Sequence, residues 1–463
     1  MSVAGSYGRH AASLRASAMA LVERLRHLLV DDSDHSIARR MAGTAFMIRV
    51  VSAGIIYVSQ ILLARWMGGF EFGVYVYVWT WLVLVAGLAP LGIAYSTQRF
   101  IPEYTAAKDR ARLRGFITGS RLLSLVLGVA ASGAGLVSLL LLGDLIDPHY
   151  RAPFLIALAC VPAFTLSSAQ DGVARSYNWI FVALVPGFVA QPILVLAIIV
   201  TQHFEGFKVD ATVAMAATAI AIWTTVIVQT IVLQRRLRTR VESGPVRYEL
   251  GRWFRTALPI FLVDGFYFLL TYTDILVLKA FVDPAQIGIY YAATKTLVVI
   301  SFIYYALSAS FAHRFSEAHF SKRRDRLEAF IRDATRWTFW PSLAAAFVLL
   351  ALGKPILTLF GEEFAAGYPL LFVLVIGLLA RASIGPGERL LIMVGEQRLC
   401  ALIYASAFVT NLLLCLVMVP RFGLVGAAAS TATALVVEST LLFVMTKRRL
   451  GLHVFFWGRR AEA

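Results

Sequence analysis

The sequence predicts an all-α polytopic membrane protein, with about 12 transmembrane helices arranged as two six-helix bundles related by a parallel repeat. Three observations support this fold class. Of 463 residues, 59% are hydrophobic and only 15% are charged, whereas a soluble domain is about a quarter charged. The apolar residues form stretches of about 20, which is the length that crosses a bilayer as a helix. Short sequence signatures also recur, 215 residues apart.

The apolar stretches divide the chain into twelve predicted spans. They cover residues 42–65, 73–97, 116–142, 153–170, 179–201, 211–233, 256–281, 287–312, 337–353, 370–390, 399–419 and 427–446. Prolines inside several spans predict kinks, which membrane helices tolerate when neighbouring groups satisfy the freed carbonyl oxygens.

The recurring signatures indicate that the second half repeats the first. Phe72-Gly73-Val74-Tyr75 matches Ile287-Gly288-Ile289-Tyr290, where Gly288 follows Gly73 by 215 positions. Each half holds an even number of spans, so both halves enter the membrane from the same side, and their symmetry axis lies along the membrane normal. The predicted regions are a basic arm over 1–40, bundles over 41–234 and 256–450, a linker over 235–255 and a tail over 451–463.

The positive charges predict the orientation of the chain. With the amino terminus inside, the predicted cytoplasmic segments hold 33 Lys and Arg residues, whereas the external turns hold six. Positive charge gathers on the cytoplasmic side of membrane proteins, so both termini are predicted to be cytoplasmic. This asymmetry explains the net charge of +16 without nucleic acid as a partner. The arm 1–40 either attaches to anionic membrane lipid or is a solvated tail, and we favour the tail.

Apart from charged residues within the last three positions of a span, seven ionisable residues lie inside the predicted spans, where each costs roughly 2.5–3.5 kcal/mol at a helix centre. They are Arg49, Arg121, Asp264, Asp274, Lys295, Arg381 and Glu438. Because contact with lipid is costly, we expect them to face the protein interior or an aqueous cavity. Arg121 lies near the end of its span, where its side chain can reach the membrane interface.

Four polar residues of the seventh span lie on one helical face. They are Asp264, Tyr267, Thr271 and Asp274, spaced i, i+3, i+7 and i+10. We predict that this face lines a cavity, and that Asp264 or Asp274 binds a coupling proton or sodium ion. The alternative is an interhelical hydrogen bond or, for Asp274, a position at the outer interface.

Two basic residues predict a cationic cavity. Arg49 lies in the first span and Lys295 in the eighth, so both place positive charge centrally if the repeats face each other. Such a cavity suits an anionic substrate such as a pyrophosphate-linked lipid, since the arginine fork binds phosphate through two hydrogen bonds. Alternatively, each pairs with Asp264 or Asp274.

Arg381 and Glu438 fall at similar depths in the second half. We predict that they form a structural ion pair rather than a transport site. Removing one partner of such a pair leaves an uncompensated buried charge.

Motifs of soluble enzymes are absent. The sequence contains no G-x-x-x-x-G-K-[ST], no G-x-S-x-G and no His/Cys cluster, so ATP hydrolysis by this chain is not predicted. The external segments are also too short for a catalytic domain. We therefore predict a secondary transporter with no metal site and no cofactor, apart from a coupling proton or sodium ion.

Four segments, spread along most of the chain, carry a resemblance to a known family. They are Leu62-Leu63-Ala64-Arg65-x-x-Gly68-x-x-Glu71-Phe72-Gly73-x-Tyr75, Asp274-Ile275-Leu276-Val277-Leu278, Ile356-Leu357-x-Leu359-Phe360-Gly361-x-Glu363-Phe364 and Pro420-Arg421-Phe422-Gly423-Leu424-Val425-Gly426. These segments resemble the Wzx-type flippases of the MOP (multidrug/oligosaccharidyl-lipid/polysaccharide) superfamily. Each is weak alone, but their order fits a layout of six and six spans. The chain departs from the family in its amino-terminal arm and at Tyr272, where a more polar or basic residue is expected.

The resemblance implies two bundles around a central cavity, in the inner membrane of a bacterium. It implies that the protein moves undecaprenyl-diphosphate-linked oligosaccharide or polysaccharide repeat units from the cytoplasmic to the periplasmic leaflet by ion-coupled alternating access. Its partners would then include a polysaccharide polymerase and glycosyltransferases. The alternative function is an ion-coupled multidrug or cation exporter of the same fold. A membrane glycosyltransferase is disfavoured by the short external and basic cytoplasmic loops.

Overall fold

The computed structural model describes residues 34–304, 324–393 and 395–456. Most of the predicted arm 1–40, the last part of the predicted span 287–312 and the end of the predicted tail lie outside the described residues.

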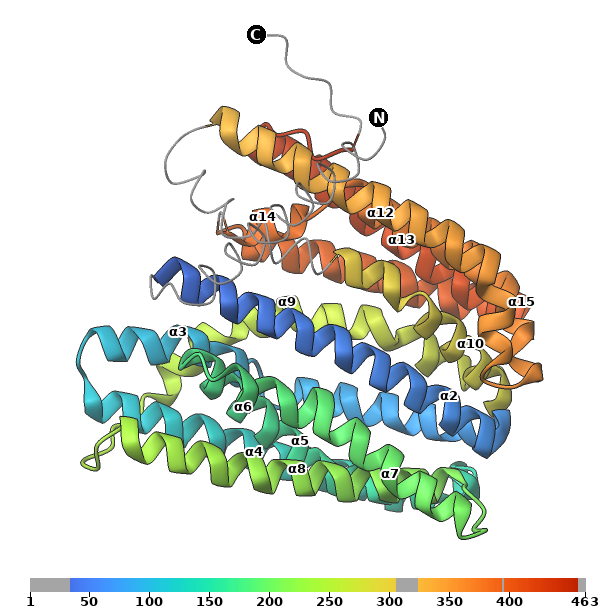
Figure 1. Ribbon diagram of the computed structural model, residues 1–463, viewed down its shortest axis with the longest axis horizontal. Helices are drawn as coiled ribbons and strands as arrows, with labels where there is room; N and C mark the ends of the chain where they lie inside the picture. Colours follow the sequence, from blue (N-terminus) through green and yellow to red (C-terminus); the bar gives the residue numbers. More distant parts are fainter. Residues whose placement is uncertain (1–33, 305–323, 394, 457–463) are drawn as a thin grey trace, which may run out of the picture.

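The helices form two lobes. In Figure 1, α2 of one lobe and α9 of the other lie in the middle of the molecule, where the two lobes meet. The N-lobe consists of α2 (Asp34–Leu88), α3 (Ile93–Ala106), α4 (Arg110–Leu141), η1 (Gly143–Leu145), α5 (Pro148–Ser176), α6 (Ile180–Val185), η2 (Pro186–Ala190), α7 (Gln191–Phe204) and α8 (Ala211–Arg240). The C-lobe consists of α9 (Leu250–Leu278), α10 (Pro284–Thr296), α12 (Arg324–Thr358), η3 (Glu362–Gly367), α13 (Tyr368–Ser383), α14 (Gly387–Met393) and α15 (Gln397–Leu450). Here η1 and η3 are 3-10 turns and η2 is a π-helical turn.

The prediction of an all-α membrane protein is confirmed. Among the described residues, ten helical segments are long and apolar enough to cross a membrane. Two of them, Gly43–Ala106 and Gln397–Leu450, have 64 and 54 residues and contain non-helical glycines, Gly68 and Gly423. At 1.5 Å per residue, each is long enough to cross a ~30 Å hydrocarbon core twice. The ten segments therefore accommodate the twelve predicted spans.

Aspartates determine where several helices begin. Asp109, Asp147 and Asp210 accept hydrogen bonds from backbone amides in the first turns of α4, α5 and α8, at 2.8–3.0 Å. These bonds satisfy amides that have no partner within the helix. The helices consequently extend beyond the apolar spans that hydropathy alone defines, as α4 does by starting at Arg110.

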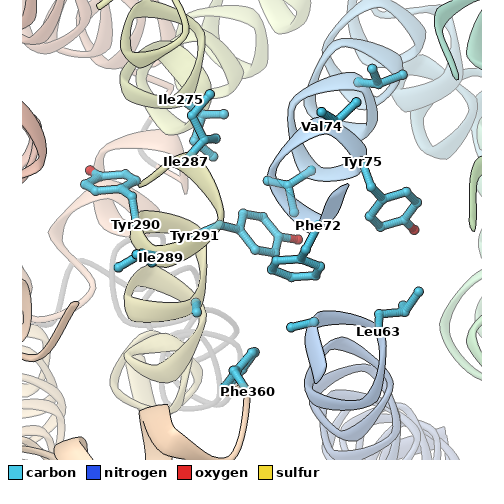
Figure 2. Packing of buried hydrophobic residues seen from close by; sticks show 14 of the residues in the cluster. Leu63, Phe72, Val74, Tyr75, Ile275, Ile287, Ile289, Tyr290, Tyr291 and Phe360 are labelled. Carbon is cyan, nitrogen blue, oxygen red and sulfur yellow. The ribbon is translucent and has the colours of Figure 1, made fainter. Parts of the chain in front are cut away.

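The two repeated signatures pack directly against each other where α2 crosses α10. A Cβ on Gly73 would overlap the backbone carbonyl of Pro284, and a Cβ on Gly288 would lie 3.1 Å from the carbonyl oxygen of Gly69. Glycine at both positions therefore lets the two backbones touch. Figure 2 shows Phe72 and Tyr291 turned toward each other beside this crossing, with ring centroids 6.1 Å apart.

Further contacts close the same end of the molecule, which we call the turn end because α2 turns there at Gly68. The amide of Gly69 donates to Oε1 of Glu363 in η3 at 2.6 Å. The hydroxyl groups of Tyr57 and Thr296 lie 3.0 Å apart and share a hydrogen bond between the lobes. The lobes are thus held together here by backbone contact, aromatic packing and hydrogen bonds, one of which has a carboxylate as its acceptor.

At the opposite end, which we call the linker end, α9 begins inside the core of the N-lobe. Trp253 is fully buried and meets Phe116 edge-on, with ring centroids 5.1 Å apart. A Cβ on Gly92 would lie 2.6 Å from the carbonyl oxygen of Ala257, so α3 and α9 also touch through a glycine. Pro259 follows within α9.

The linker that precedes α9 is fixed to the N-lobe by Glu249. Its carboxylate lies 2.9 Å from Nε of Arg112 and 3.3 Å from Nη1 of Arg252, and it accepts a 3.1 Å hydrogen bond from the hydroxyl of Tyr104. Although burial raises the pKa of Glu249, these hydrogen bonds and positive charges lower it below its ordinary value overall. A carboxyl group whose pKa is lowered by folding stabilises the docked linker above its unfolded pKa, and this contribution is lost as the pH falls through the folded pKa.

The described part of the predicted tail packs on the C-lobe. Leu452 and Val454 are buried in a cluster with Ile331 and Leu390. The amide of Phe456 donates to the carbonyl oxygen of Ser383 at 3.1 Å, where α13 ends. The tail therefore covers the break between α13 and α14.

We expect Gly73→Val to separate the lobes at the turn end. The new side chain meets rigid backbone, and overpacking of this kind costs about 1–3 kcal/mol, enough to change a two-state ratio roughly tenfold. Spin-label distances between the lobes at the turn end should lengthen. Gly54→Ala on the same helix is the control, since nothing lies within 4 Å of a Cβ there. Unchanged distances in Gly73→Val would contradict the assigned role of the glycine crossing.

We also expect Glu249→Gln to loosen the linker. Hydrogen exchange of the Arg247 amide, which donates to the carbonyl oxygen of Ala111 at 3.0 Å, should accelerate at neutral pH. Protection of this amide in the wild type should decrease as the pH falls, after correction for intrinsic exchange. Glu242→Gln is the matched control, because its ion pair with Arg110 is exposed and exposed pairs contribute little. Equal protection in both variants would remove Glu249 as the anchor.

Candidate functional site

In the N-lobe, the predicted substrate residue Arg49 belongs to a small cationic cluster. Arg49 is exposed on α2, and its guanidinium lies 5.2 Å from the ring centroid of Phe188 in η2. It acts electrostatically on Asp171 of α5. Nε of Arg175 donates to both oxygens of Asp171 at 3.0 Å. Two guanidinium groups therefore share one carboxylate, so the cluster carries net positive charge.

The structure places an electrostatic partner of Arg49 within its own lobe. The sequence left open a pairing of Arg49 with Asp264 or Asp274, and the structure adds Asp171 as an acidic neighbour. Hydropathy ends the fourth span at residue 170, which leaves Asp171 and Arg175 outside it. Helix α5 continues to Ser176. The spacing of Asp171 and Arg175, at i and i+4, is the signal that predicts this continuation.

Lys295 lies in the last turn of α10, next to the contact between the lobes. Its Nζ is 4.6 Å from the ring centroid of Tyr291, and its charge acts on Asp274. The adjacent Thr296 shares its hydrogen bond with Tyr57 of α2. Lys295 is half-buried, so its positive charge lies close to the N-lobe but is partly covered.

Asp274 is buried and held by three hydrogen bonds. Its Oδ2 accepts from the hydroxyls of Tyr290 in α10 at 2.6 Å and Thr431 in α15 at 3.2 Å. Its Oδ1 accepts from the backbone amide of Ile275 at 2.8 Å. This is the interhelical arrangement that the sequence offered as the alternative to an ion-binding role. Asp274 thus joins three helices of the C-lobe.

Asp264 has a more open environment and lies between the lobes. It is half-buried and acts electrostatically on Tyr95 of α3. From the C-lobe, the charges of Glu388 and Arg389 act on it. A change in the charge of Asp264 is therefore felt by groups of both lobes.

The predicted polar face of α9 divides among several neighbours. Tyr267 meets Tyr404 of α15 edge-on, with centroids 5.5 Å apart, and lies under the guanidinium of Arg381 at 5.6 Å. Thr271 is exposed, and its hydroxyl donates to the carbonyl oxygen of Tyr267 within the same helix at 2.8 Å. The role of these two residues in lining a cavity stays a prediction.

Arg381 forms the centre of a cluster of three charges. Its Nε lies 3.5 Å from Oε1 of Glu438 in α15, and its Nη2 lies 3.5 Å from Oε2 of Glu388 in α14. The predicted pair is therefore present in the structure, together with a second carboxylate that the sequence interpretation missed. Glu388 lies near the end of the predicted span 370–390, where hydropathy gives no sign that a carboxylate is buried. The break after α13 instead turns it inward.

The arrangement of the two lobes is that of the MOP superfamily transporters. The chain matches an inward-facing multidrug resistance MATE family transporter at 16% identity and a TM-score of 0.72, over 88% of this chain and 98% of that one. It matches the lipid II flippase MurJ in an inward closed conformation at 15% identity and a TM-score of 0.67, over 87% of each chain. A MOP superfamily transporter from Pyrococcus furiosus matches at 15% identity and a TM-score of 0.65, over 92% of this chain and 97% of that one. The fold is therefore that of a MOP superfamily transporter.

The sequence narrows this class to one family. The family model of the lipid II flippase MurJ matches residues 97–458, which is well over half of the chain, so the chain belongs to the MurJ lipid II flippase family. It is a multi-pass membrane flippase for a lipid-linked substrate, and a transporter rather than an enzyme. The predicted superfamily is thereby confirmed, whereas Wzx-type specificity stays a prediction. No curated protein matches the chain.

We expect Asp274→Asn to destabilise the C-lobe. In asparagine, an NH2 group replaces one carboxylate oxygen, so at least one of the three donors then faces another donor. A buried group that is left without a hydrogen-bond partner costs about 1–3 kcal/mol. Equilibrium unfolding in detergent micelles should show this loss. Thr271→Val is the control on the same helix, because Thr271 is exposed and bonds only to its own helix. A variant as stable as the wild type would show that the carboxylate does not join the three helices.

Proposed function

We propose that this protein translocates a polyprenyl-diphosphate-linked saccharide from the cytoplasmic to the outer leaflet of a bacterial inner membrane. The family name supplies lipid II as one candidate substrate, and the resemblance in sequence supplies the repeat units of a surface polysaccharide as another. Both share an anionic diphosphate head and an apolar tail. The head requires a cationic site within the membrane, while the tail remains in lipid.

The observation that carries this proposal is the exposed Arg49 on a membrane-spanning helix. An arginine in contact with lipid at this depth costs roughly 2.5–3.5 kcal/mol, which favours a position on an aqueous route. Arg49 lies beside Asp171 and Arg175, and the cluster has one more cation than anion. A diphosphate would engage the arginine forks through bidentate hydrogen bonds.

The contacts between the lobes support an alternating-access cycle. The turn end is closed by the glycine crossing and by the bond from Gly69 to Glu363. With the positively charged linker end in the cytoplasm, the substrate head enters from the linker side against Arg49 and Lys295. The cycle proceeds when the turn end opens, and ligands bias it only through different affinities for the two states.

We further propose that exchange of a coupling ion at a carboxylate of α9 biases this cycle. Asp264 is the better placed candidate, because it lies between Tyr95 of the N-lobe and Glu388 of the C-lobe. Asp274 is already occupied by three donors. A proton or sodium ion on Asp264 would alter an interaction that spans the two lobes.

A multidrug or cation exporter is the second candidate function, favoured by the fold shared with the MATE family. Such an exporter would carry cations past a site that is acidic or aromatic. The net positive charge around Arg49 disfavours this alternative. Depletion of the protein in the native bacterium separates the two functions. Accumulation of a lipid-linked saccharide on the cytoplasmic leaflet supports the flippase and identifies its substrate, whereas normal glycans with altered sensitivity to small cations support the exporter.

We expect Arg49→Ala to lower the rate of translocation by roughly ten- to hundred-fold, because a hydrogen bond to a charged group contributes about 1.5–3 kcal/mol. The measurement is the transfer of a fluorescent polyprenyl-diphosphate-linked saccharide across proteoliposomes that contain the full chain. Arg49→Lys should retain part of the rate, since lysine keeps the charge but lacks the fork. Arg65→Ala, exposed at the turn end of α2, is the matched control. An unchanged rate in Arg49→Ala would remove Arg49 from the mechanism.

A further inference from the structure

We propose that Arg381, Glu388 and Glu438 form a proton-binding site in the C-lobe, in which two carboxyl groups share one guanidinium and one bound proton. The proposal goes beyond the proposed function, which assigns a coupling ion to Asp264 of α9, by adding a second position at which the C-lobe holds a proton. The binding of the proton itself does not depend on which substrate is transported.

The geometry brings three helices to one guanidinium. Arg381 lies in the last turn of α13, with Glu388 of α14 and Glu438 of α15 each 3.5 Å away. Glu438 is fully buried and Glu388 is 9% exposed. Neither carboxylate oxygen of Glu438 accepts a hydrogen bond within the described part of the chain. A buried carboxylate without a hydrogen-bond donor is unfavourable as an anion, and protonation removes that penalty.

The charges of the three side chains also favour a bound proton. The cluster contains one cation and two carboxyl groups, so one negative charge is left over when both are ionised. The ring centroids of Tyr267 and Tyr304 lie 5.6 and 4.9 Å from the guanidinium carbon of Arg381. Tyrosine is neutral near pH 7, so neither ring compensates the excess charge.

Among the described residues, further titratable groups of the surrounding helices interact with the two carboxylates. Tyr404 of α15 interacts with both carboxylates, and Cys400 interacts with Glu388 and with Glu396. Asp264 faces Glu388 from α9 and is itself balanced in part by Arg389. One proton shared between two carboxyl groups resolves such an excess, as happens wherever two carboxylates cannot both ionise.

A proton fits the cluster better than a metal ion does. The guanidinium lies between the carboxyl groups and repels any other cation that needs both of them. Within the described residues, no group of three or more His, Cys, Asp or Glu side chains is placed to hold a metal ion. A proton needs only one oxygen. A small cavity, roughly the size of one water molecule, lies beside Arg381 and is lined by Ser301 and Tyr304, and it offers a place from which a proton can be exchanged.

The test is infrared difference spectroscopy of the purified full chain between acidic and alkaline pH, which detects the carbonyl stretch of protonated carboxylic acids. The wild type should show protonated carboxyl groups that persist above the pH at which exposed carboxyl groups ionise, and one of them should belong to this cluster. Glu388→Gln and Glu438→Gln should each remove that component of the band, because the remaining carboxylate then pairs with Arg381 alone, whereas any contribution from Asp264 or Asp274 should remain. Glu205→Gln, exposed at the end of α7, should leave it unchanged.

Three outcomes would overturn the proposal. The first is the absence of a persistent protonated carboxyl band in the wild type. The second is a band whose intensity is the same in either glutamine variant as in the wild type. The third is loss of the band on adding sodium at constant pH, which would assign the cluster to sodium. If Glu438→Gln fails to fold, Glu388→Gln alone decides. Because the spectrum is recorded without substrate, a protein that binds the proton but flips no lipid contradicts only the proposed function.

Discussion

The close approach of α2 and α10 is the constraint on which the arrangement of the lobes depends. Two glycines at matching positions of the two repeats, Gly73 and Gly288, allow the backbones to touch at the turn end. No other residue leaves this space, since any Cβ on Gly73 meets the backbone of Pro284. Aromatic side chains then fill the surroundings of the crossing. The duplication therefore has a physical use, because each copy supplies one half of a single contact.

The main charged clusters lie within single lobes, whereas the contacts at the turn end join the two lobes. Arg49 is balanced within the N-lobe by Asp171, and Arg381 within the C-lobe by Glu388 and Glu438. At the turn end, the lobes meet mainly through packing and through bonds such as that between Tyr57 and Thr296. Breaking a buried ion pair is far more costly than breaking a neutral hydrogen bond. In the proposed cycle, each lobe can thus move without separating these clusters, and Asp264 is one charged group whose surroundings would change with the movement.

Hydropathy, charge and the repeat were sufficient to predict the membrane fold and its two halves. The residues that the prediction missed have a shared physical origin, because each lies where a helix continues past its apolar stretch or breaks within it. Asp171 and Arg175 extend α5 beyond the fourth span, and Glu388 follows the break after α13. Burial of these groups depends on neighbours from distant parts of the chain. Hydropathy of a single span cannot show such neighbours, and the same limit left the environment of Asp274 open until its three donors were seen.

The start of α9 within the N-lobe has a mechanical consequence. Trp253 is anchored among aromatic side chains of the first repeat, while Val263 and Leu270, further along α9, pack with α15 in the second. Helix α9 therefore connects the two lobes, and its first turn is held in the N-lobe. When the lobes rotate, α9 must either pull Trp253 from its cluster or bend. Pro259 lies just beyond the anchored turn and lacks the amide that would otherwise stiffen the helix there. Bending at Pro259 costs less than removing Trp253 from its cluster, so we expect α9 to bend at Pro259 if the lobes rotate.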